Sequence, residues 1–85
     1  MADNPIVAAS LDVVDLKCPL PVLKARKALE ALADGAVLEV LASDPAAGED
    51  FAAFCLATGH RLIGQSTKPG IQRFLIQKRA HASGT

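Results

Sequence analysis

The sequence predicts an α+β fold, a two-layer sandwich in which two helices pack on a four-stranded mixed sheet, in the order β-α-β-α-β-β. Two patterns in the chain lead to this prediction. Short segments alternate apolar and polar residues, as half-buried strands do. Two longer segments repeat their apolar residues every three or four positions, as amphipathic helices do. Because a strand–helix–strand connection places its helix on one face of the sheet, two layers follow.

The first strand is expected over about residues 8–14 and the first helix over about residues 19–33. The apolar residues of this helix share one face by their spacing: Val22, Ala25, Leu29 and Leu32. Asp34-Gly35 follows the helix, and glycine is the expected residue at a helix C-terminus.

The second strand is expected over about residues 36–42, with Leu38, Val40 and Ala42 on one face. Asp44 and Pro45 have the chemistry of a helix start, since Asp can cap and Pro is tolerated at the first helical position. Asp50 is a second candidate cap. We expect the second helix over about residues 47–58. Its buried face is expected to hold four residues: Phe51, Phe54, Cys55 and Thr58.

The last two strands are expected over about residues 60–66 and 72–78. Between them, Thr67-Lys68-Pro69-Gly70 has the composition of a tight turn, so the two strands form a hairpin. Phe74 and Ile76 share one face of the final strand.

The composition is that of one globular domain, which we assign to residues 1–85, with order over about residues 6–79 and short flexible ends. Lys plus Arg equal Asp plus Glu, and the net charge of +0 argues against a dedicated nucleic-acid binder. No apolar run approaches the ~20 residues of a membrane span. The first residues lack the basic segment of a signal peptide. We therefore expect a cytoplasmic protein whose thiols are reduced.

Cys18 is the main candidate for chemistry. It lies between the first strand and the first helix, because Pro19 and Pro21 are tolerated only in a helix's first turn. The positive end of a helix dipole stabilises a thiolate and lowers its pKa. Lys17, Lys24 and Lys27 would add positive potential if they turn the same way. We therefore expect Cys18 to be an exposed nucleophile of lowered pKa; the alternative is a cysteine that merely packs at the helix end.

The segment Leu16-Lys17-Cys18-Pro19-Leu20-Pro21-Val22 resembles the Cys-Pro-x-Pro signature of the TusA/SirA-like family of small sulfur-carrier proteins. The likeness extends over about residues 11–78 and includes the segments Ser43-Asp44-Pro45-Ala46 and Gly59-His60. Many relatives have a polar or acidic residue where this chain has Leu20, which leaves the choice of partner open.

This resemblance implies the same fold and a sulfurtransferase activity without a cofactor. Cys18 would accept sulfane sulfur as a persulfide from a cysteine desulfurase or a rhodanese-type protein and pass it to an acceptor protein. The acceptor could serve tRNA thiolation, molybdenum-cofactor synthesis or sulfur oxidation. Pro19 and Pro21 would support the motif. Lys17, Lys24 and Lys27 either form a solvated helix face or a docking surface for an acidic partner. We expect a monomer without direct contact to nucleic acid or membrane.

The remaining candidates have weaker claims. Cys55 lies on an apolar helix face, where a free cysteine usually packs. Asp44 could orient Cys18 if the strand ends converge, and His60 is a minor candidate base. His81, in the C-terminal tail, has less claim than His60. The cysteines and histidines lack the spacing of a zinc site.

Two other function classes remain open at this level. A binding or regulatory module with an incidental cysteine could use the sheet face that the helices leave open. An RNA-binding domain is suggested by the two-layer shape and the basic first helix, but zero net charge and the lack of an aromatic platform count against it.

Overall fold

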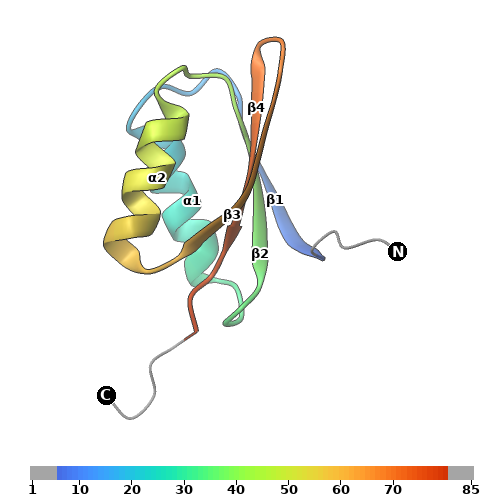
Figure 1. Cartoon of the computed structure of the whole chain (residues 1–85), viewed down its shortest axis with the longest axis vertical. Coiled ribbons are helices and arrows are strands. Elements are labelled where there is room, and N and C mark those ends of the chain that lie inside the picture. Colours follow the sequence, from blue (N-terminus) through green and yellow to red (C-terminus); the bar gives the residue numbers. More distant parts are fainter. Residues whose placement is uncertain (1–5, 81–85) are drawn as a thin grey trace.

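The computed structural model describes residues 6–80, and it has the two-layer fold and the element order that the sequence predicts. Both helices lie on one side of the sheet (Figure 1). The elements, in chain order, are β1 (Val7–Val13), α1 (Leu20–Glu30), β2 (Val37–Ala42), α2 (Ala47–Thr58), β3 (Arg61–Lys68) and β4 (Ile71–Gln77).

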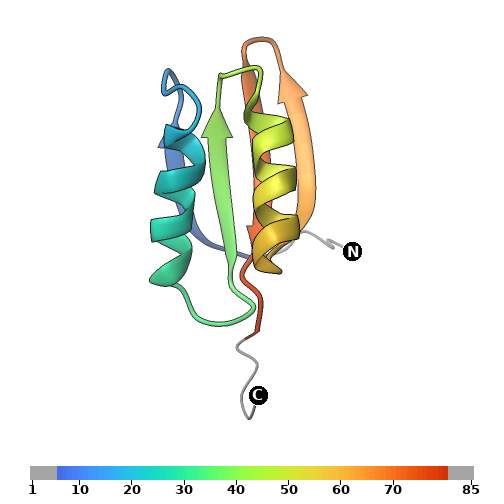
Figure 2. The ribbon, with the colours of Figure 1, turned by 90° about the vertical axis from the view of Figure 1, so that its left-hand side faces the viewer.

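The sheet is mixed, with the strand order β1-β2-β4-β3. β1 and β2 are parallel, while β4 is antiparallel to both of its neighbours, β2 and β3. Figure 2 shows α1 lying over β1 and β2, and α2 lying over β4 and β3. Because β1 and β2 run in the same direction, their last residues, Val13 and Ala42, are paired neighbours. The two loops that lead into the helices therefore begin side by side at one edge of the sheet.

The core lies between the sheet and the helices. The predicted inward face of β2 is confirmed, since Leu38, Val40 and Ala42 are fully buried. In the helix layer, Phe51 meets Phe74 of β4 with ring centroids 5.0 Å apart. The other buried residues of this cluster are Val13, Ala25, Leu29, Ala47, Phe54, Cys55 and Ile76. This close packing between layers holds the start of α2 against the sheet.

The first helix is shorter than the sequence predicts. We expected it over residues 19–33, but α1 ends at Glu30, with Ala31 as its C-cap residue. Single turns follow, in which the N–H of Leu32 donates to the carbonyl of Leu29 and the N–H of Ala36 donates to the carbonyl of Ala33. Gly35 has a φ of +81° and lies in the turn before β2 instead of capping the helix. The apolar spacing continues past the helix end because Leu32 still packs against the core from the turn.

The second helix has the predicted bounds, but Asp44 does not cap it. Its N-cap residue is Ala46, and no side chain caps it. The carboxylate of Asp44 instead accepts a hydrogen bond from the N–H of Ala46, two residues on, before the helix begins. Gly59 ends α2 in the left-handed conformation, as expected of a helix C-terminus.

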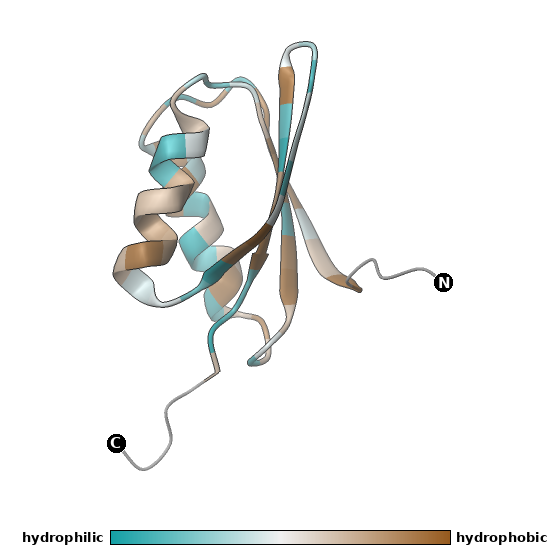
Figure 3. Ribbon diagram, in the orientation of Figure 1, coloured by the Kyte–Doolittle hydropathy of each residue, from teal (hydrophilic) through white to brown (hydrophobic). Residues whose placement is uncertain are grey.

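The sheet face away from the helices is polar near its middle. Glu39 of β2 accepts hydrogen bonds from Ser10 of β1 and from Arg73 of β4. β4 does not alternate strictly in hydropathy: the polar pair Gln72-Arg73 is followed by three buried apolar residues, Phe74 to Ile76. Figure 3 shows hydrophilic and hydrophobic stretches along the sheet strands. Within residues 6–80, neither helix is long and apolar enough to cross a membrane.

Candidate functional site

Two loops at the sheet edge are tied together, and Cys18 lies in one of them. The N–H of Asp15, in the β1–α1 loop, donates to the hydroxyl of Ser43 over 2.8 Å. The N–H of Cys18 donates to Oδ2 of Asp44 over 2.7 Å. The other oxygen of Asp44 accepts the N–H of Ala46 over 2.9 Å. The Asp44 carboxylate thus bridges the two loops and fixes the backbone of Cys18. The strand ends thus converge, which meets the condition for Asp44 to orient Cys18, and the bond to the Cys18 N–H gives Asp44 a positioning role.

The prolines define where α1 begins. Pro19 is the N-cap residue, with its carbonyl accepting the N–H of Leu23 over 3.1 Å, and Pro21 is the second residue of the helix. The peptide bond between Cys18 and Pro19 is cis. Pro21 is buried, whereas Cys18 and Pro19 are exposed. The motif therefore leaves the thiol at the surface, directly before the first turn of the helix.

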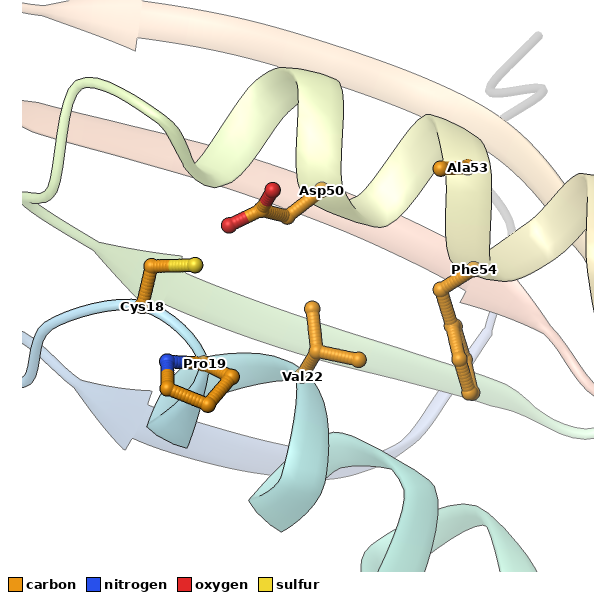
Figure 4. Close-up of a pocket in the computed structure, with 6 residues that line it drawn as sticks. All are labelled: Cys18, Pro19, Val22, Asp50, Ala53 and Phe54. Atoms are coloured by element: carbon orange, nitrogen blue, oxygen red, sulfur yellow. The ribbon is translucent and has the colours of Figure 1, made fainter.

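A shallow groove of about 320 Å³ extends from Cys18 between the two helices (Figure 4). Cys18, Pro19 and Val22 line it on the side of α1. The lining from α2 consists of Asp50, Ala53 and Phe54. Carbon atoms form most of its surface, and Asp50 is the charged residue among those that line it. Figure 4 shows the Asp50 carboxylate and the Cys18 sulfur pointing toward each other across the mouth of the groove.

The expectation of a lowered Cys18 pKa is wrong. A hydrogen bond with the Asp50 carboxylate, partial desolvation, and the negative charges of Asp50 and Asp44 together raise the pKa of Cys18 above its ordinary value. Each of these effects disfavours the thiolate relative to the neutral thiol. The helix end that the sequence predicts is present, but the carboxylate of Asp50 faces the sulfur, and Asp44, bound to the N–H of Cys18, adds a second negative charge nearby.

The lysines also differ from the expectation. Lys24 and Lys27 line a second hollow, of about 260 Å³, together with Leu11 of β1 and Ala28. That hollow lies on the β1 side of α1, whereas the groove at Cys18 lies on the α2 side. Of these three lysines, Lys17 is the one that affects a residue of the site, since its positive charge contributes to lowering the pKa of Asp44. Lys24 and Lys27 therefore do not turn toward the thiol, which was the condition for them to add positive potential there.

Cys55 and His60 are not brought to the site. Cys55 is 6% exposed in the core, and burial raises the pKa of its thiol. His60 follows the C-terminal end of α2 and does not line the Cys18 groove, but its ring centroid lies 5.6 Å from that of Phe54, which does line it. Its Nδ1 accepts the N–H of Arg79 over 3.0 Å, and burial with nearby positive charge lowers its pKa. Cys55 thus packs in the core, as expected, and His60 packs against Phe54 instead of lining the groove.

His81 lies outside the described residues. Among residues 6–80, no three His, Cys, Asp or Glu side chains gather in a way that could hold a metal ion. The chemistry available at the site is therefore that of one exposed thiol, two carboxylates and an apolar groove.

Asp50 is the residue that sequence reasoning missed, because it was considered only as a helix cap. A signal was present in the chain: Asp50 lies one turn before Phe54, which the helical spacing predicts to be buried. That spacing places a carboxylate beside an apolar residue on α2. Which group the Asp50 carboxylate faces depends on how α1 and α2 pack against each other, and the spacing of residues along α2 gives no information about that packing.

Comparisons with known proteins identify the family of this chain. The family model described as Sulfurtransferase TusA matches residues 9–78. The chain is 46% identical over 68 residues to the sulfur carrier protein TusA of Allochromatium vinosum, covering 80% of this chain and 90% of that one. It is 42% identical over 72 residues to the sulfur carrier protein TusA of Pseudomonas entomophila, covering 85% and 90%.

A solved structure supports the fold. The crystal structure of a SirA-like protein from Desulfitobacterium hafniense superposes with a TM-score of 0.73 and covers 84% of this chain and 97% of that one, at 23% sequence identity. That match concerns the architecture alone. The family model and the two relatives, which each match most of the chain, lead to the conclusion that this protein belongs to the TusA family of sulfur carrier proteins.

Proposed function

We propose that this protein carries sulfane sulfur as a persulfide on Cys18 and passes it to a partner protein. The observation that supports this most directly is the setting of the thiol. It is exposed at the mouth of an open, mostly apolar groove, and the bond from its N–H to Asp44 fixes its backbone. An accessible thiol on a fixed backbone suits repeated attack on, and by, the active sites of other proteins.

The proposed transfer needs no external oxidant or reductant. The Cys18 thiolate attacks the terminal sulfur of a donor persulfide, R–S–SH, and forms a new S–S bond. The old S–S bond breaks, and the donor leaves as the thiolate R–S⁻, which takes up the proton that Cys18 lost. Cys18 is then Cys18–S–SH. An acceptor thiolate repeats the same exchange on the terminal sulfur and restores the thiol of Cys18.

Two kinds of protein partner follow from this cycle. The donor would be a cysteine desulfurase or a rhodanese-type protein, and the acceptor would serve tRNA thiolation, molybdenum-cofactor synthesis or sulfur oxidation. We place the cycle in the cytoplasm, where thiols stay reduced. Lys24 and Lys27, with Leu11 and Ala28, are proposed as a docking surface that steers an acidic partner to the α1 side of the molecule.

The test is sulfur loading of single-cysteine variants. We incubate wild type, Cys18→Ser and Cys55→Ser with a cysteine desulfurase and cysteine, and measure the intact mass. Wild type and Cys55→Ser should gain the mass of one sulfur atom, and a reductant should remove it. Cys18→Ser should gain none while keeping the wild-type circular dichroism spectrum. Loading of Cys18→Ser to the wild-type level would refute the proposal.

The alternative, a binding module with an incidental cysteine, has one observation in its favour. The sheet face away from the helices has a hollow of about 370 Å³, lined by Leu41, Ser66, Lys68, Pro69, Ile71 and Arg73. A partner bound there would not need the thiol. Wild-type and Cys18→Ser proteins would then capture that partner equally well, and neither would load sulfur.

A further inference from the structure

The groove beside Cys18 carries a negative charge directly at the reacting atom. Asp50 lies in the first turns of α2, and its carboxylate points at the Cys18 sulfur (Figure 4). The other groove-lining residues contributed by α2, Ala53 and Phe54, are apolar. Glu49 precedes Asp50 and is exposed, but it does not line the groove. Of these two neighbouring carboxylates of α2, Asp50 therefore lines the groove and Glu49 lies outside it.

The charges around the thiol do not balance one another. Asp50 acts on it by a hydrogen bond and by its charge, and Asp44 adds a second negative charge. Of the cations nearby, Lys17 adjoins Cys18 in the chain but acts on Asp44. Lys24 and Lys27 line the hollow on the β1 side of α1. A group that approaches the sulfur through the groove thus passes the Asp50 carboxylate, and within residues 6–80 the lining of the groove contains no cationic side chain.

We propose that Asp50 is a selectivity residue for sulfur transfer: its carboxylate, which faces the Cys18 sulfur from the groove wall, admits sulfur donors that bring a positive charge into the groove and disfavours anionic ones. This deepens the proposed function and rests on it. Three properties of Asp50 support it: the orientation of its carboxylate, its position on the groove wall, and its contrast with Glu49.

The proposal assigns a role to the partner. A Lys, Arg or protonated His beside the donor persulfide would pair with Asp50 and withdraw the hydrogen bond from the thiol. The thiol proton is then free to leave, and the thiolate attacks the terminal sulfur as described above. A small anionic persulfide lacks this cation and is repelled. Cys18 would thus stay protected from adventitious electrophiles and react within a matching protein complex.

The experiment measures charge selectivity without any sulfur donor. Two methanethiosulfonate reagents of similar size are used, one with a 2-aminoethyl cation and one with a 2-sulfonatoethyl anion. In both cases the Cys18 thiolate attacks the sulfenyl sulfur, a disulfide forms and methanesulfinate leaves. Rates at Cys18 are followed by quenching and peptide mass mapping, which separates Cys18 from Cys55.

Wild type should react faster with the cationic reagent. The interaction of two unit charges about 4 Å apart in water changes a reaction rate about fivefold. The rate of the cationic reagent at Cys18, divided by that of the anionic reagent, should therefore exceed the same ratio for a cysteine in a neutral peptide by about fivefold or more. Raising the salt to about 1 M, where the Debye length is about 3 Å, should reduce this ratio.

Three variants make the result specific to Asp50. Asp50→Asn should lower the ratio about fivefold and move the pH profile of alkylation by iodoacetamide, a neutral reagent, to lower pH. Asp50→Glu keeps the charge and should keep most of the preference for the cation. Glu49→Gln removes the same charge from the same helix turn but outside the groove, so it should behave as wild type. Thermal melting of each variant checks that the fold is intact.

The outcomes separate this inference from the proposed function. If Asp50→Asn and Glu49→Gln change the ratio equally, or if neither changes it, Asp50 does not select by charge and the inference is wrong. The persulfide proposal depends on sulfur loading at Cys18, which this experiment does not measure. Conversely, Cys18 could fail to load sulfur while the charge selectivity of its thiol is as described.

Discussion

At the scale of single residues, the reactivity of Cys18 is set by opposing effects. The end of α1 favours a thiolate, since a helix N-terminus carries about half a positive charge. The carboxylates of Asp50 and Asp44 disfavour it, and the pKa of Cys18 is raised. The helix dipole is diffuse, whereas the carboxylate of Asp50 points directly at the sulfur. Under the proposed function, we expect such a thiol to react slowly on its own and to react faster within a matching protein complex.

Asp44 leads to a prediction about pH. The N–H groups of Ala46 and Cys18 hydrogen-bond its carboxylate and lower its pKa. A group whose pKa is lower in the folded state contributes stability above its unfolded pKa and loses that contribution as the pH falls through its folded pKa. Asp44→Asn, which keeps one oxygen, should therefore be less stable than wild type at neutral pH. The difference should shrink below about pH 4, where an ordinary Asp becomes protonated.

Urea unfolding of both proteins between pH 7 and pH 3 measures this difference directly. Asp12→Asn is the control. Its carboxylate accepts the N–H of Val14, two residues on, but does not tie the two loops together. A constant gap between wild type and Asp44→Asn over this range would contradict the role of the Asp44 charge.

At the scale of elements, the ends of the helices decide where the site forms. Pro19 and Pro21 start α1 directly after Cys18, and Gly59 stops α2 at the far end from the groove. Gly59 has a φ of +86°, a conformation that other residues adopt at a cost. The stop matters because the chain must turn there to enter β3, which pairs with β4 against the core.

Substituting two glycines separates the cost of backbone strain from the cost of steric crowding around an added Cβ. Gly59→Ala and Gly35→Ala both force an L residue into the left-handed region, which costs about 1–2 kcal/mol. At Gly35 a Cβ would meet no atom within 4 Å, but at Gly59 it would lie 3.2 Å from Cδ of Arg79. That Arg79 side chain also donates to the carbonyl of Thr58. We expect Gly59→Ala to lower the free energy of unfolding by more than Gly35→Ala does, measured by urea denaturation. Equal losses would mean that Arg79 moves away freely.

At the scale of the whole molecule, one aromatic contact joins the two layers. Phe51 and Phe74 are fully buried, with ring centroids 5.0 Å apart and planes tilted by 42°. Phe51 directly follows Asp50, so the same turn of α2 supplies both a core anchor and the carboxylate at the thiol. The position of Asp50 therefore depends on the packing of the entire sandwich.

Removing that anchor should be costly for so small a protein. Phe51→Ala should lower the free energy of unfolding by about 3–5 kcal/mol, the usual range for a buried Phe. A domain of this length has only about 4–13 kcal/mol in total. Leu56, on the same helix, is 88% exposed, and Leu56→Ala should change stability by less than about 0.5 kcal/mol. Chemical denaturation of both variants tests this, and a loss of less than about 1.5 kcal/mol for Phe51→Ala would show that the anchor is not needed.

The sequence by itself determined the order of the elements, the bounds of α2 and the inward faces of β2 and β4. These features follow from local periodicity, which the chain records residue by residue. It also placed Cys18 at the start of α1, because proline is restricted to a few backbone positions. The Cys-Pro-x-Pro motif then pointed to the sulfur carrier family.

Only the tertiary structure decided what surrounds the thiol. Asp44 reaches Cys18 because the parallel pairing of β1 and β2 brings two loops together, and Asp50 reaches it because α2 packs beside α1. The same packing left Lys24 and Lys27 on the other side of α1. Electrostatic effects depend on distances through space, and residues 26 and 32 positions apart in the chain carry no local sign of their proximity. The chain therefore predicts that Cys18 is the nucleophile, and the fold raises the pKa of its thiol.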